Sequence, residues 1–199
     1  MSIAISGWNT TITQELFGLI SHRERRSRIS SRVVDSYRNR NIPPGFPNAD
    51  RYLFAQGLMV GETVEQNMDP SEIYEVNLIS VMQRVAAAFR RNNRARVVVI
   101  GSMSAELGSH DAHYAAAKAG LHSFVRVWTG LPDRGQLNCV APTIISDSRM
   151  TEARDDYPAV LKERRTVSAR QVADLVYYLL YTDSGINRAV IEMTGDKIV

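Results

Sequence analysis

The chain has 199 residues, of which 44% are hydrophobic, and its formal net charge is +3. This length suits one globular domain with a substantial core, which we expect to span residues 1–199. The chain has no run of 18 apolar residues, and Ile3–Ile5 is too short an apolar stretch for a signal peptide, so no membrane partner is expected. The single cysteine, Cys139, excludes an internal disulfide, and these features together predict a cytoplasmic protein.

Short apolar runs alternate with segments of helical spacing along the chain. In the first half we expect, in chain order, strand Ser2–Ser6, helix Thr10–Ser21, strand Arg32–Val34, a proline-rich loop at Arg38–Asp50, strand Tyr52–Ala55 and helix Ser71–Arg91. In the second half we expect strand Arg96–Ile100, helix His113–Thr129, strand Gln136–Val140, helix Thr151–Lys162, helix Ala169–Tyr181 and strand Ala189–Met193. This alternation predicts a parallel sheet covered by helices on both faces.

The basic residues are mostly arginines, and they are densest in the run His22–Arg28. A nucleic-acid surface would combine such a run with aromatic stacking platforms. Acidic residues interrupt the run and no aromatic platform is evident, so we expect no nucleic-acid partner. The remaining readings are a solvated helix end and a pocket for a nucleotide phosphate.

The clearest chemical signal is the pair Tyr114 and Lys118, which lie four residues apart. On a helix, this spacing puts both side chains on one face. A nearby ammonium favours the phenolate and lowers the pKa of the phenol, which suits Tyr114 to proton transfer at neutral pH. Ser102 directly follows the apolar strand and would lie at the carboxyl edge of the sheet, with Ser104 as its rival. Serine, tyrosine and lysine together indicate carbonyl–alcohol redox chemistry.

Landmarks along nearly the whole chain resemble the short-chain dehydrogenase/reductase (SDR) family. They are Val76-Asn77-Leu78, Ile100-Gly101-Ser102, Tyr114-x-x-x-Lys118, Asn138-Cys139-Val140-Ala141-Pro142 and Val190-Ile191-Glu192-Met193-Thr194-Gly195. The resemblance implies an α/β fold with a Rossmann-type doubly wound parallel sheet. It also implies a nicotinamide cofactor, no metal, and the catalytic set Asn77, Ser102, Tyr114 and Lys118.

The resemblance also implies a role for each member of this set. Lys118 would bind the nicotinamide ribose and lower the tyrosine pKa. Ser102 would hold the substrate oxygen against Tyr114. Asn77 would kink its helix and hold a water that leads to the lysine.

By the same resemblance, the cofactor-binding residues are expected at the carboxyl edge of the sheet. They are Gly7, Asn9, Thr11, Ile12, Asp35, Arg38, Ala55, Gln56, Gly57, Tyr114, Lys118 and Ile145. The phosphate loop of the family has the pattern G-x-x-x-G-x-G, but only Gly7 is kept, and Thr11 and Thr13 stand at the other two glycine positions. Threonine adds a branched side chain where the backbone should approach the pyrophosphate. Its hydroxyl could instead bind a phosphate, and the helix N-terminus still offers free N–H groups.

The identity of the cofactor depends on residues near the second strand. Asp35 lies where an acid would bind the ribose 2′-hydroxyl of NAD. Arg38 and the arginines before it favour the 2′-phosphate of NADP. We therefore expect NADP, with NAD as the alternative.

The chain is shorter than the family pattern in two places. The span from Gly7 to Gly57 is too short for the usual two strand–helix units, so one helix or strand should be trimmed. The span from Pro142 to Ser168, normally a lid over the substrate, is also short. A short lid suggests an open site that suits a bulky substrate or one presented by a partner.

The leading interpretation is an NAD(P)-dependent oxidoreductase that acts on a small-molecule carbonyl or secondary alcohol, with Tyr114 as proton donor or acceptor. The alternative is a catalytically silent, SDR-like nucleotide-binding scaffold or sensor. The resemblance also implies a homodimer or homotetramer, formed through the helices that carry Asn77 and Tyr114. Apolar and small residues expected at that interface are Ile79, Val81, Ala86, Ala87, Phe89, Ala116, Ala119, Phe124 and Val127.

Overall fold

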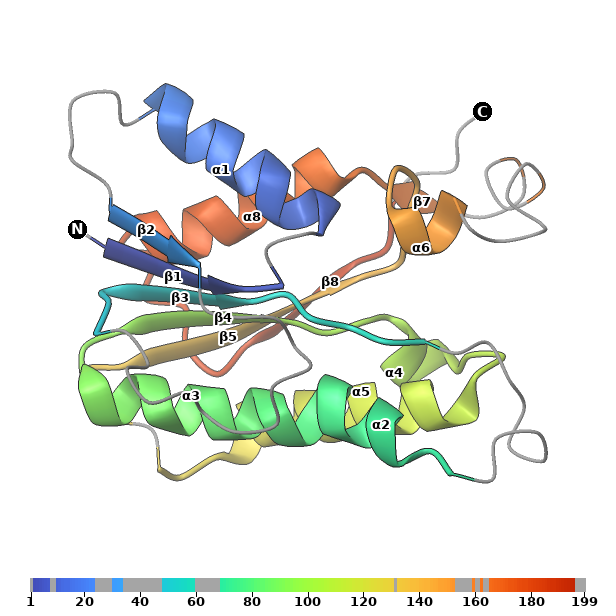
Figure 1. The fold of residues 1–199 in the computed structure, drawn as a ribbon, viewed down its shortest axis with the longest axis horizontal. Coiled ribbons are helices and arrows are strands. Elements are labelled where there is room, and N and C mark those ends of the chain that lie inside the picture. Colours follow the sequence, from blue (N-terminus) through green and yellow to red (C-terminus); the bar gives the residue numbers. More distant parts are fainter. Residues whose placement is uncertain are drawn as a thin grey trace.

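The computed structural model describes residues 2–7, 10–23, 30–33, 48–59, 69–130, 132–152, 159, 162 and 165–195. These residues form three layers, in which a parallel sheet lies between two layers of helices (Figure 1). The elements are β1 (Ser2–Ser6), α1 (Thr11–Arg23), β2 (Ser30–Val33), β3 (Arg51–Phe54), α2 (Ser71–Tyr74), the π-helical turn η1 (Glu75–Ile79), α3 (Ser80–Arg91), β4 (Arg96–Ile100), α4 (Ser104–Leu107), α5 (Ala112–Val127), β5 (Gln136–Pro142), β6 (Ile144–Ile145), α6 (Arg149–Glu152), β7 (Thr166–Val167), α8 (Ala169–Tyr181) and β8 (Val190–Met193).

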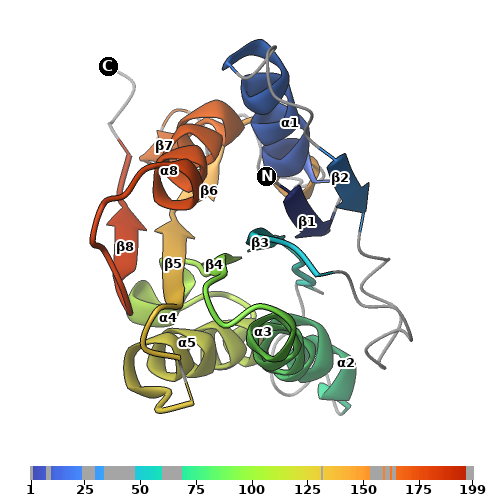
Figure 2. The same ribbon diagram turned by 90° about the vertical axis from the view of Figure 1, so that its left-hand side faces the viewer.

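Within the described residues, the main sheet has six strands in the order β2-β1-β3-β4-β5-β8, and all of its pairs are parallel. A separate pair, β6 and β7, is also parallel. Helices α1 and α8 cover one face of the main sheet, and α2, η1, α3 and α5 cover the other (Figure 2). The expected α/β fold is therefore confirmed.

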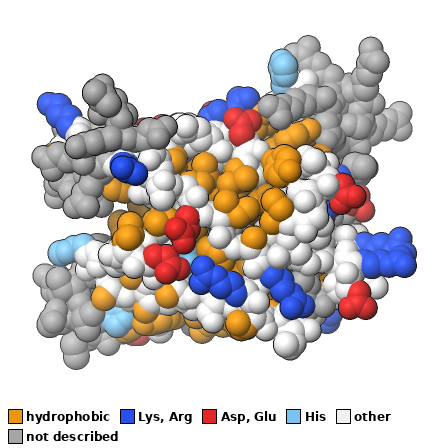
Figure 3. Space-filling model, turned by 180° about the vertical axis from the view of Figure 1, so that it is seen from behind, with side chains coloured by type: hydrophobic (Ala, Val, Ile, Leu, Met, Phe, Trp, Pro, Cys, Tyr) orange, Lys and Arg blue, Asp and Glu red, His pale blue; other side chains and the backbone are white. Residues whose placement is uncertain are grey.

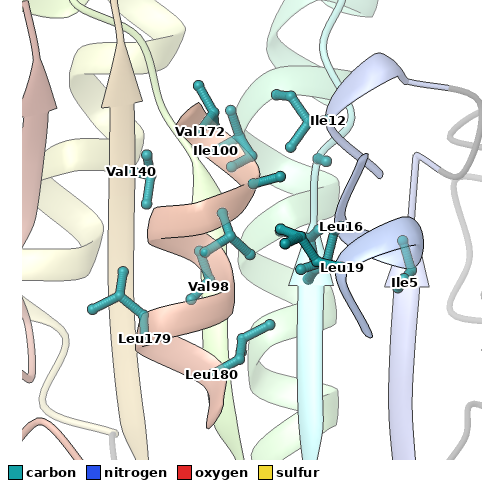
Figure 4. Close-up of a cluster of buried hydrophobic side chains, with 14 of the residues drawn as sticks. Ile5, Ile12, Leu16, Leu19, Val98, Ile100, Val140, Val172, Leu179 and Leu180 are labelled. Carbon is teal, nitrogen blue, oxygen red and sulfur yellow. The ribbon is translucent and has the colours of Figure 1, made fainter. Parts of the chain in front are cut away.

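The central strands are apolar without interruption because both faces of the sheet are buried. In β4, Val97 and Val99 pack in the core beneath α3 and α5, whereas Val98 and Ile100 pack beneath α1 and α8. Figure 4 shows this second core, where side chains of β4 and β5 meet those of α1 and α8. The strict alternation of side chains along a strand therefore joins the two helical layers through one sheet.

The chain reverses its direction of travel across the sheet between β1 and β3. The connection from β1 through α1 leads outward to β2, whereas β3 continues through α2 and α3 to β4 on the other side. In open parallel sheets, the crevice beyond the carboxyl ends of such a strand pair is where ligands bind. This topology puts the ligand crevice beside Gly7 and the residues that follow β3.

Most of the expected elements are confirmed to within two residues, and the deviations have local causes. The expected helix Ser71–Arg91 is interrupted by η1, in which Asn77 lies. The pair β6–β7 was not expected, because two-residue strands have no periodicity to detect. Of the expected helix Thr151–Lys162, the described residues show α6 and helical backbone at residues 159 and 162, and most of the remainder lies outside them.

The expected trimming between the first and third strands stays a prediction, because residues 34–47 lie outside the described part of the chain. Between β1 and β3, the described residues hold one helix, α1, and one strand, β2. Most of the proline-rich loop lies outside the described residues. None of the helices in the described part of the chain is both long and apolar enough to cross a bilayer.

Part of the expected subunit interface is buried within the subunit instead. Val81, Ala87 and Phe89 belong to the core between α3 and the sheet, so they are not available to a partner. Ile79 and Val127 are exposed. The sequence pattern could not separate the two sets, because small and apolar residues occupy both sides of these helices.

Candidate active site

Helix α5 brings Tyr114 and Lys118 to the carboxyl edge of β4. Asp111 caps this helix, and its carboxylate accepts a hydrogen bond of 2.8 Å from the backbone N–H of Tyr114. Such a cap fixes where the helix begins and therefore which face Tyr114 occupies. Both side chains are buried, and Nζ of Lys118 lies 5.6 Å from the centroid of the Tyr114 ring.

Ser102 is the serine that lies against Tyr114. It follows β4 directly, and its hydroxyl lies near enough to the Tyr114 phenol to lower the pKa of that phenol. Ser104 instead begins the short helix α4, and its backbone N–H donates to Oγ of Ser102 over 3.1 Å. The structure thus brings Ser102, Tyr114 and Lys118 together, with Ser104 supporting the serine.

Burial controls the protonation of the pair on α5. Burial raises the pKa of Tyr114, and the hydrogen bond from Ser102 opposes this only in part. The net shift in the free protein is therefore upward, opposite to the expected lowering, because loss of solvation is the largest influence on this phenol. The expected effect of Lys118 together with a bound nicotinamide stays a prediction. Burial also lowers the pKa of Lys118 to about 8. Nζ of Lys118 keeps one hydrogen bond, of 2.9 Å, to the carbonyl oxygen of Ile100.

Asn77 is fully buried in the π-helical turn and clamps the segment after β3. Its Nδ2 donates to the carbonyl oxygens of Leu58 and Ile73, at 2.7 Å and 2.9 Å. Its Oδ1 accepts from the N–H of Leu58 at 3.2 Å. The expected irregularity of this helix is confirmed. The amide that a helix interior would normally exclude is satisfied because the wide turn lets it reach a second backbone.

Gly57 lies between Asn77 and Lys118. A Cβ at this position would be 3.6 Å from Oδ1 of Asn77 and 3.9 Å from Nζ of Lys118. The backbone that follows β3 thus passes close to both side chains. The water between Asn77 and the lysine, implied by the family resemblance, stays a prediction.

The loop between β1 and α1 keeps the tight turn of a phosphate loop but changes its lining. Gly7 has a φ of +81°, and a Cβ there would lie 2.8 Å from both the carbonyl carbon of Ala55 and the backbone nitrogen of Gln56. Only glycine fits this approach. Oγ1 of the buried Thr13 lies 2.8 Å from the carbonyl oxygen of Thr10 and 3.1 Å from that of Gly7. The Thr13 hydroxyl is therefore bound within the loop and turned away from a phosphate.

Two buried polar side chains at the switch point have no hydrogen-bond partner within the described residues. They are Ser6 at the end of β1, through Oγ, and Gln56 after β3, through both amide atoms. A buried amide without a partner carries a free-energy cost, which a polar ligand in the crevice would remove. This is the feature of the fold that best fits a nucleotide with ribose and phosphate oxygens.

Some of the other expected cofactor residues lie within the described part of the chain, and some lie outside it. Ile12 is buried in the core beneath α1, and Thr11 begins that helix. Ile145 belongs to β6, where it pairs with β7 in the short span that replaces the lid. Asn9, Asp35 and Arg38 lie outside the described residues.

Sequence reasoning missed a histidine beneath the serine. His122 lies on α5 one turn after Lys118 and is buried, and the backbone N–H of Ser102 donates to its Nε2 over 3.4 Å. Its Nδ1 lies 3.3 Å from Oε1 of Glu106 on α4. The spacing of four residues from Lys118 was the signal that could have found it, since this puts His122 on the same helix face.

Sequence comparison finds relatives that match part of this chain. A family model described as short chain dehydrogenase matches residues 57–158. The 3-oxoacyl-[acyl-carrier-protein] reductase MabA from Mycobacterium avium is 34% identical over 137 residues, which are 63% of this chain and 53% of the relative. The chain spans about half the length of the curated relatives it matches.

Solved structures match almost the whole chain. A short-chain dehydrogenase/reductase of the glucose/ribitol dehydrogenase type from Brucella melitensis superposes with a TM-score of 0.79 and 18% identity, covering 100% of this chain and 96% of that chain. The 3-alpha-hydroxysteroid dehydrogenase from Pseudomonas sp. B-0831, complexed with NADH, has a TM-score of 0.72 and 18% identity, covering 98% and 96%. At this identity the likeness shows a shared Rossmann-like fold.

The buried lysine should leave a signature in the pH dependence of stability. The pKa of Lys118 is about 8 in the folded protein and 10.5 for an ordinary lysine, so the unfolded chain binds more protons between these values. The wild type should therefore gain stability as pH rises through this window, whereas Lys118→Met should not. Urea unfolding should show the stability of Lys118→Met relative to wild type falling by about 2 kcal/mol between pH 7 and pH 9.5.

Lys162→Met is the matched control, because the Lys162 side chain is exposed. Its stability should run parallel to that of the wild type across the same pH range. Parallel curves for Lys118→Met as well would mean that Lys118 titrates like a solvated lysine.

Proposed function

The chain belongs to the short-chain dehydrogenase/reductase family, and we propose that it is an NAD(P)-dependent oxidoreductase that interconverts a carbonyl and a secondary alcohol. The observation that carries the proposal is the buried group formed by Ser102, Tyr114 and Lys118 at the carboxyl edge of β4. Three polar side chains gathered there carry a cost in desolvation, which a catalytic use would explain.

Each residue has one chemical task in this proposal. The Ser102 hydroxyl binds the substrate oxygen beside the Tyr114 phenol. Because burial raises the pKa of Tyr114, the phenol carries its proton at neutral pH and is suited to protonate a carbonyl oxygen. Lys118 binds the nicotinamide ribose, and the bound dinucleotide supplies or accepts the hydride.

The crevice at the switch point fits a dinucleotide in two respects. The tight turn at Gly7 leads to the N-terminus of α1, and a helix N-terminus favours a phosphate. The unpartnered atoms of Ser6 and Gln56 match the hydroxyl and phosphate oxygens of a nucleotide. We assign the adenosine side of the cofactor to this crevice, with Ala55 close to its ribose, and place Gly57 nearer the nicotinamide side, beside Lys118.

NADP is the proposed cofactor, with NAD as the alternative. The support for NADP is the arginine-rich sequence around Arg38, and Asp35 is the support for NAD. As substrate class we propose a 3-oxoacyl thioester first, because the curated relatives are named as 3-oxoacyl-[acyl-carrier-protein] reductases. The short span between Pro142 and Ser168 suits an acyl chain presented by a carrier.

A silent nucleotide-binding scaffold is the second candidate, and the phosphate loop favours it. Thr13 stands at the position of a family glycine, and its hydroxyl is hydrogen-bonded to carbonyl oxygens of the same loop. In this second candidate, the protein binds a dinucleotide but does not convert a carbonyl substrate.

Titration with NADPH, NADP, NADH and NAD is the experiment that tests the proposal. We expect calorimetry or fluorescence to show binding, tighter for NADPH than for NADH, because a 2′-phosphate gains the nearby arginines. If none of the four binds at millimolar concentration, the proposed oxidoreductase is excluded.

Gln56→Leu sharpens this test. The apolar side chain removes a buried amide that has no partner among the described residues, so the free protein should be at least as stable as the wild type. Cofactor affinity should nevertheless fall about 3- to 10-fold, the effect of one ordinary hydrogen bond. The exposed Gln14→Leu is the control and should change neither quantity. Unchanged affinity in Gln56→Leu would remove Gln56 from the cofactor site.

Tyr114→Phe should remove turnover and leave cofactor binding intact. The substitution removes the phenolic hydroxyl that carries the transferred proton, so we expect kcat to fall at least about 100-fold. The dissociation constant for NADPH should stay within about two-fold, since Lys118 is unchanged. The exposed Tyr178→Phe is the control and should keep wild-type kcat. Near wild-type turnover in Tyr114→Phe would assign the proton to another group.

We also propose that the chain forms a homodimer, or a homotetramer, through its outer surfaces. After the buried residues are set aside, Ile79 and Val127 still expose apolar surface on the layer of α3 and α5, at 42% and 65%. Figure 3 shows further hydrophobic side chains on the face that carries the edge strand β8, whose Val190, Ile191 and Met193 are only partly buried. Two apolar surfaces on one subunit suit two symmetric contacts.

Light scattering should therefore give at least twice the 22.3 kDa of one chain at micromolar concentration. Ile79→Glu should lower this mass, because a symmetric interface meets the introduced charge twice. Phe17→Glu, on α1 across the sheet, is the control and should not change it. A wild-type mass near that of one chain would refute the oligomer.

A further inference from the structure

The imidazole of His122 lies directly beneath the backbone that carries Ser102. The side chain is only 1% exposed and packs between α5 and the end of β4. A Cβ at Gly101 would overlap the His122 ring, so the glycine before the serine is what lets the ring approach. The proton-transfer scheme proposed above makes no use of this histidine.

The hydrogen bonds on both sides of the ring select one protonation state. The N–H of Ser102 donates to Nε2 over 3.4 Å, so Nε2 must carry a lone pair. Nδ1, 3.3 Å from Oε1 of Glu106, must then carry the proton and donate it to that carboxylate. Only the neutral tautomer with hydrogen on Nδ1 satisfies both contacts. Both bonds are longer than the common 2.9–3.0 Å, so each should have a modest effect.

We propose that His122 is a positioning residue for the Ser102 hydroxyl: its neutral ring ties the backbone N–H of Ser102 to Glu106 on α4 and so holds the serine against Tyr114. This role rests on the proposed oxidoreductase function. It gives the catalytic serine a second anchor besides its contact with Tyr114.

Burial is the main influence on the pKa of His122, and the charged groups around the ring act in both directions. Burial lowers its pKa, Glu106 opposes this, and Arg126 and Lys118 on the same helix add to it. Arg126 itself reaches Glu106, with 3.8 Å between Nη2 and Oε1. Behind Gly101, burial raises the pKa of the Cys139 thiol to about 12, so the strand side adds no charge.

Acid should release this anchor. A second proton would sit on Nε2, facing the N–H of Ser102, and two donors cannot form a hydrogen bond. Because burial lowers the pKa of His122 below its ordinary 6.5, the release should occur on the acid side of that value. Turnover should fall there while cofactor binding persists.

Steady-state kinetics between pH 5 and pH 9 separate positioning from simple packing. His122→Gln keeps an acceptor for Ser102 and a donor for Glu106 but does not titrate, so kcat at pH 7 should stay close to wild type while the acid limb disappears. His122→Leu fills the space without either bond, so kcat should fall about 3- to 10-fold with an unchanged KM for the cofactor. His110→Gln is the control, because His110 is exposed, and should keep the wild-type acid limb.

Glu106→Gln tests the direction in which the acid limb of the pH profile moves. It keeps an acceptor for Nδ1 but removes the carboxylate that raises the pKa of His122, so the acid limb should move to lower pH. The inference would be overturned if the acid limb of the pH profile of kcat did not move in Glu106→Gln and was also retained in His122→Gln. That result would leave the proposed oxidoreductase function unaffected, because the kcat of Tyr114→Phe tests that function separately.

If the wild type binds cofactor without turnover, nitrogen NMR of the histidines decides the same question. The inference expects His122 to carry its proton on Nδ1, and expects the Ser102 amide resonance to shift as His122 titrates but not in His122→Gln. A proton on Nε2 would overturn the inference whether or not the protein is an enzyme. These spectra use only the wild type and His122→Gln, so this test does not depend on whether His122→Leu folds.

Discussion

The missing side chain at Gly101 is the constraint on which the site depends. Because this glycine occupies so little space, the His122 ring and the Cys139 thiol both approach the end of β4. The same backbone offers the Ile100 carbonyl to Lys118 and turns Ser102 toward Tyr114. Any Cβ at Gly101 would push apart the strand and the helix that together hold these groups.

Burial, more than charge pairing, decides the proton chemistry of the free protein. Tyr114 and Lys118 share one apolar environment, and desolvation shifts each toward its neutral form, raising the pKa of the phenol and lowering that of the amine. A neutral phenol carries a proton that it can donate to a substrate oxygen. The pKa of Lys118 would rise again if ribose hydroxyls replaced the solvent that the amine lost, so the set suits the proposed cofactor.

The two ends of the ligand crevice have diverged by different amounts. At the reacting end, Asn77 holds the backbone after β3 with three hydrogen bonds, and Gly57 leaves room between Asn77 and Lys118. At the phosphate end, Gly7 keeps the close turn but Thr13 bonds to its own loop. Binding at that end then depends on the helix N-terminus and on the unpartnered amide of Gln56. Both the proposed enzyme and the silent scaffold need this second end to bind a nucleotide, and they differ in whether a carbonyl is then turned over.

The sequence by itself determined what depends on short spans of chain. Apolar runs and helical spacing located the strands and main helices, and the spacing of Tyr114 and Lys118 placed these two side chains on one helix face, because these patterns repeat over one or two turns. Tertiary structure alone decided the rest. The contacts of Ser102 with His122 and of Leu58 with Asn77 span 20 and 19 residues, so no local pattern announces them. The direction of the Tyr114 pKa shift depends on how much solvent the packed layers exclude, which is a property of the whole fold.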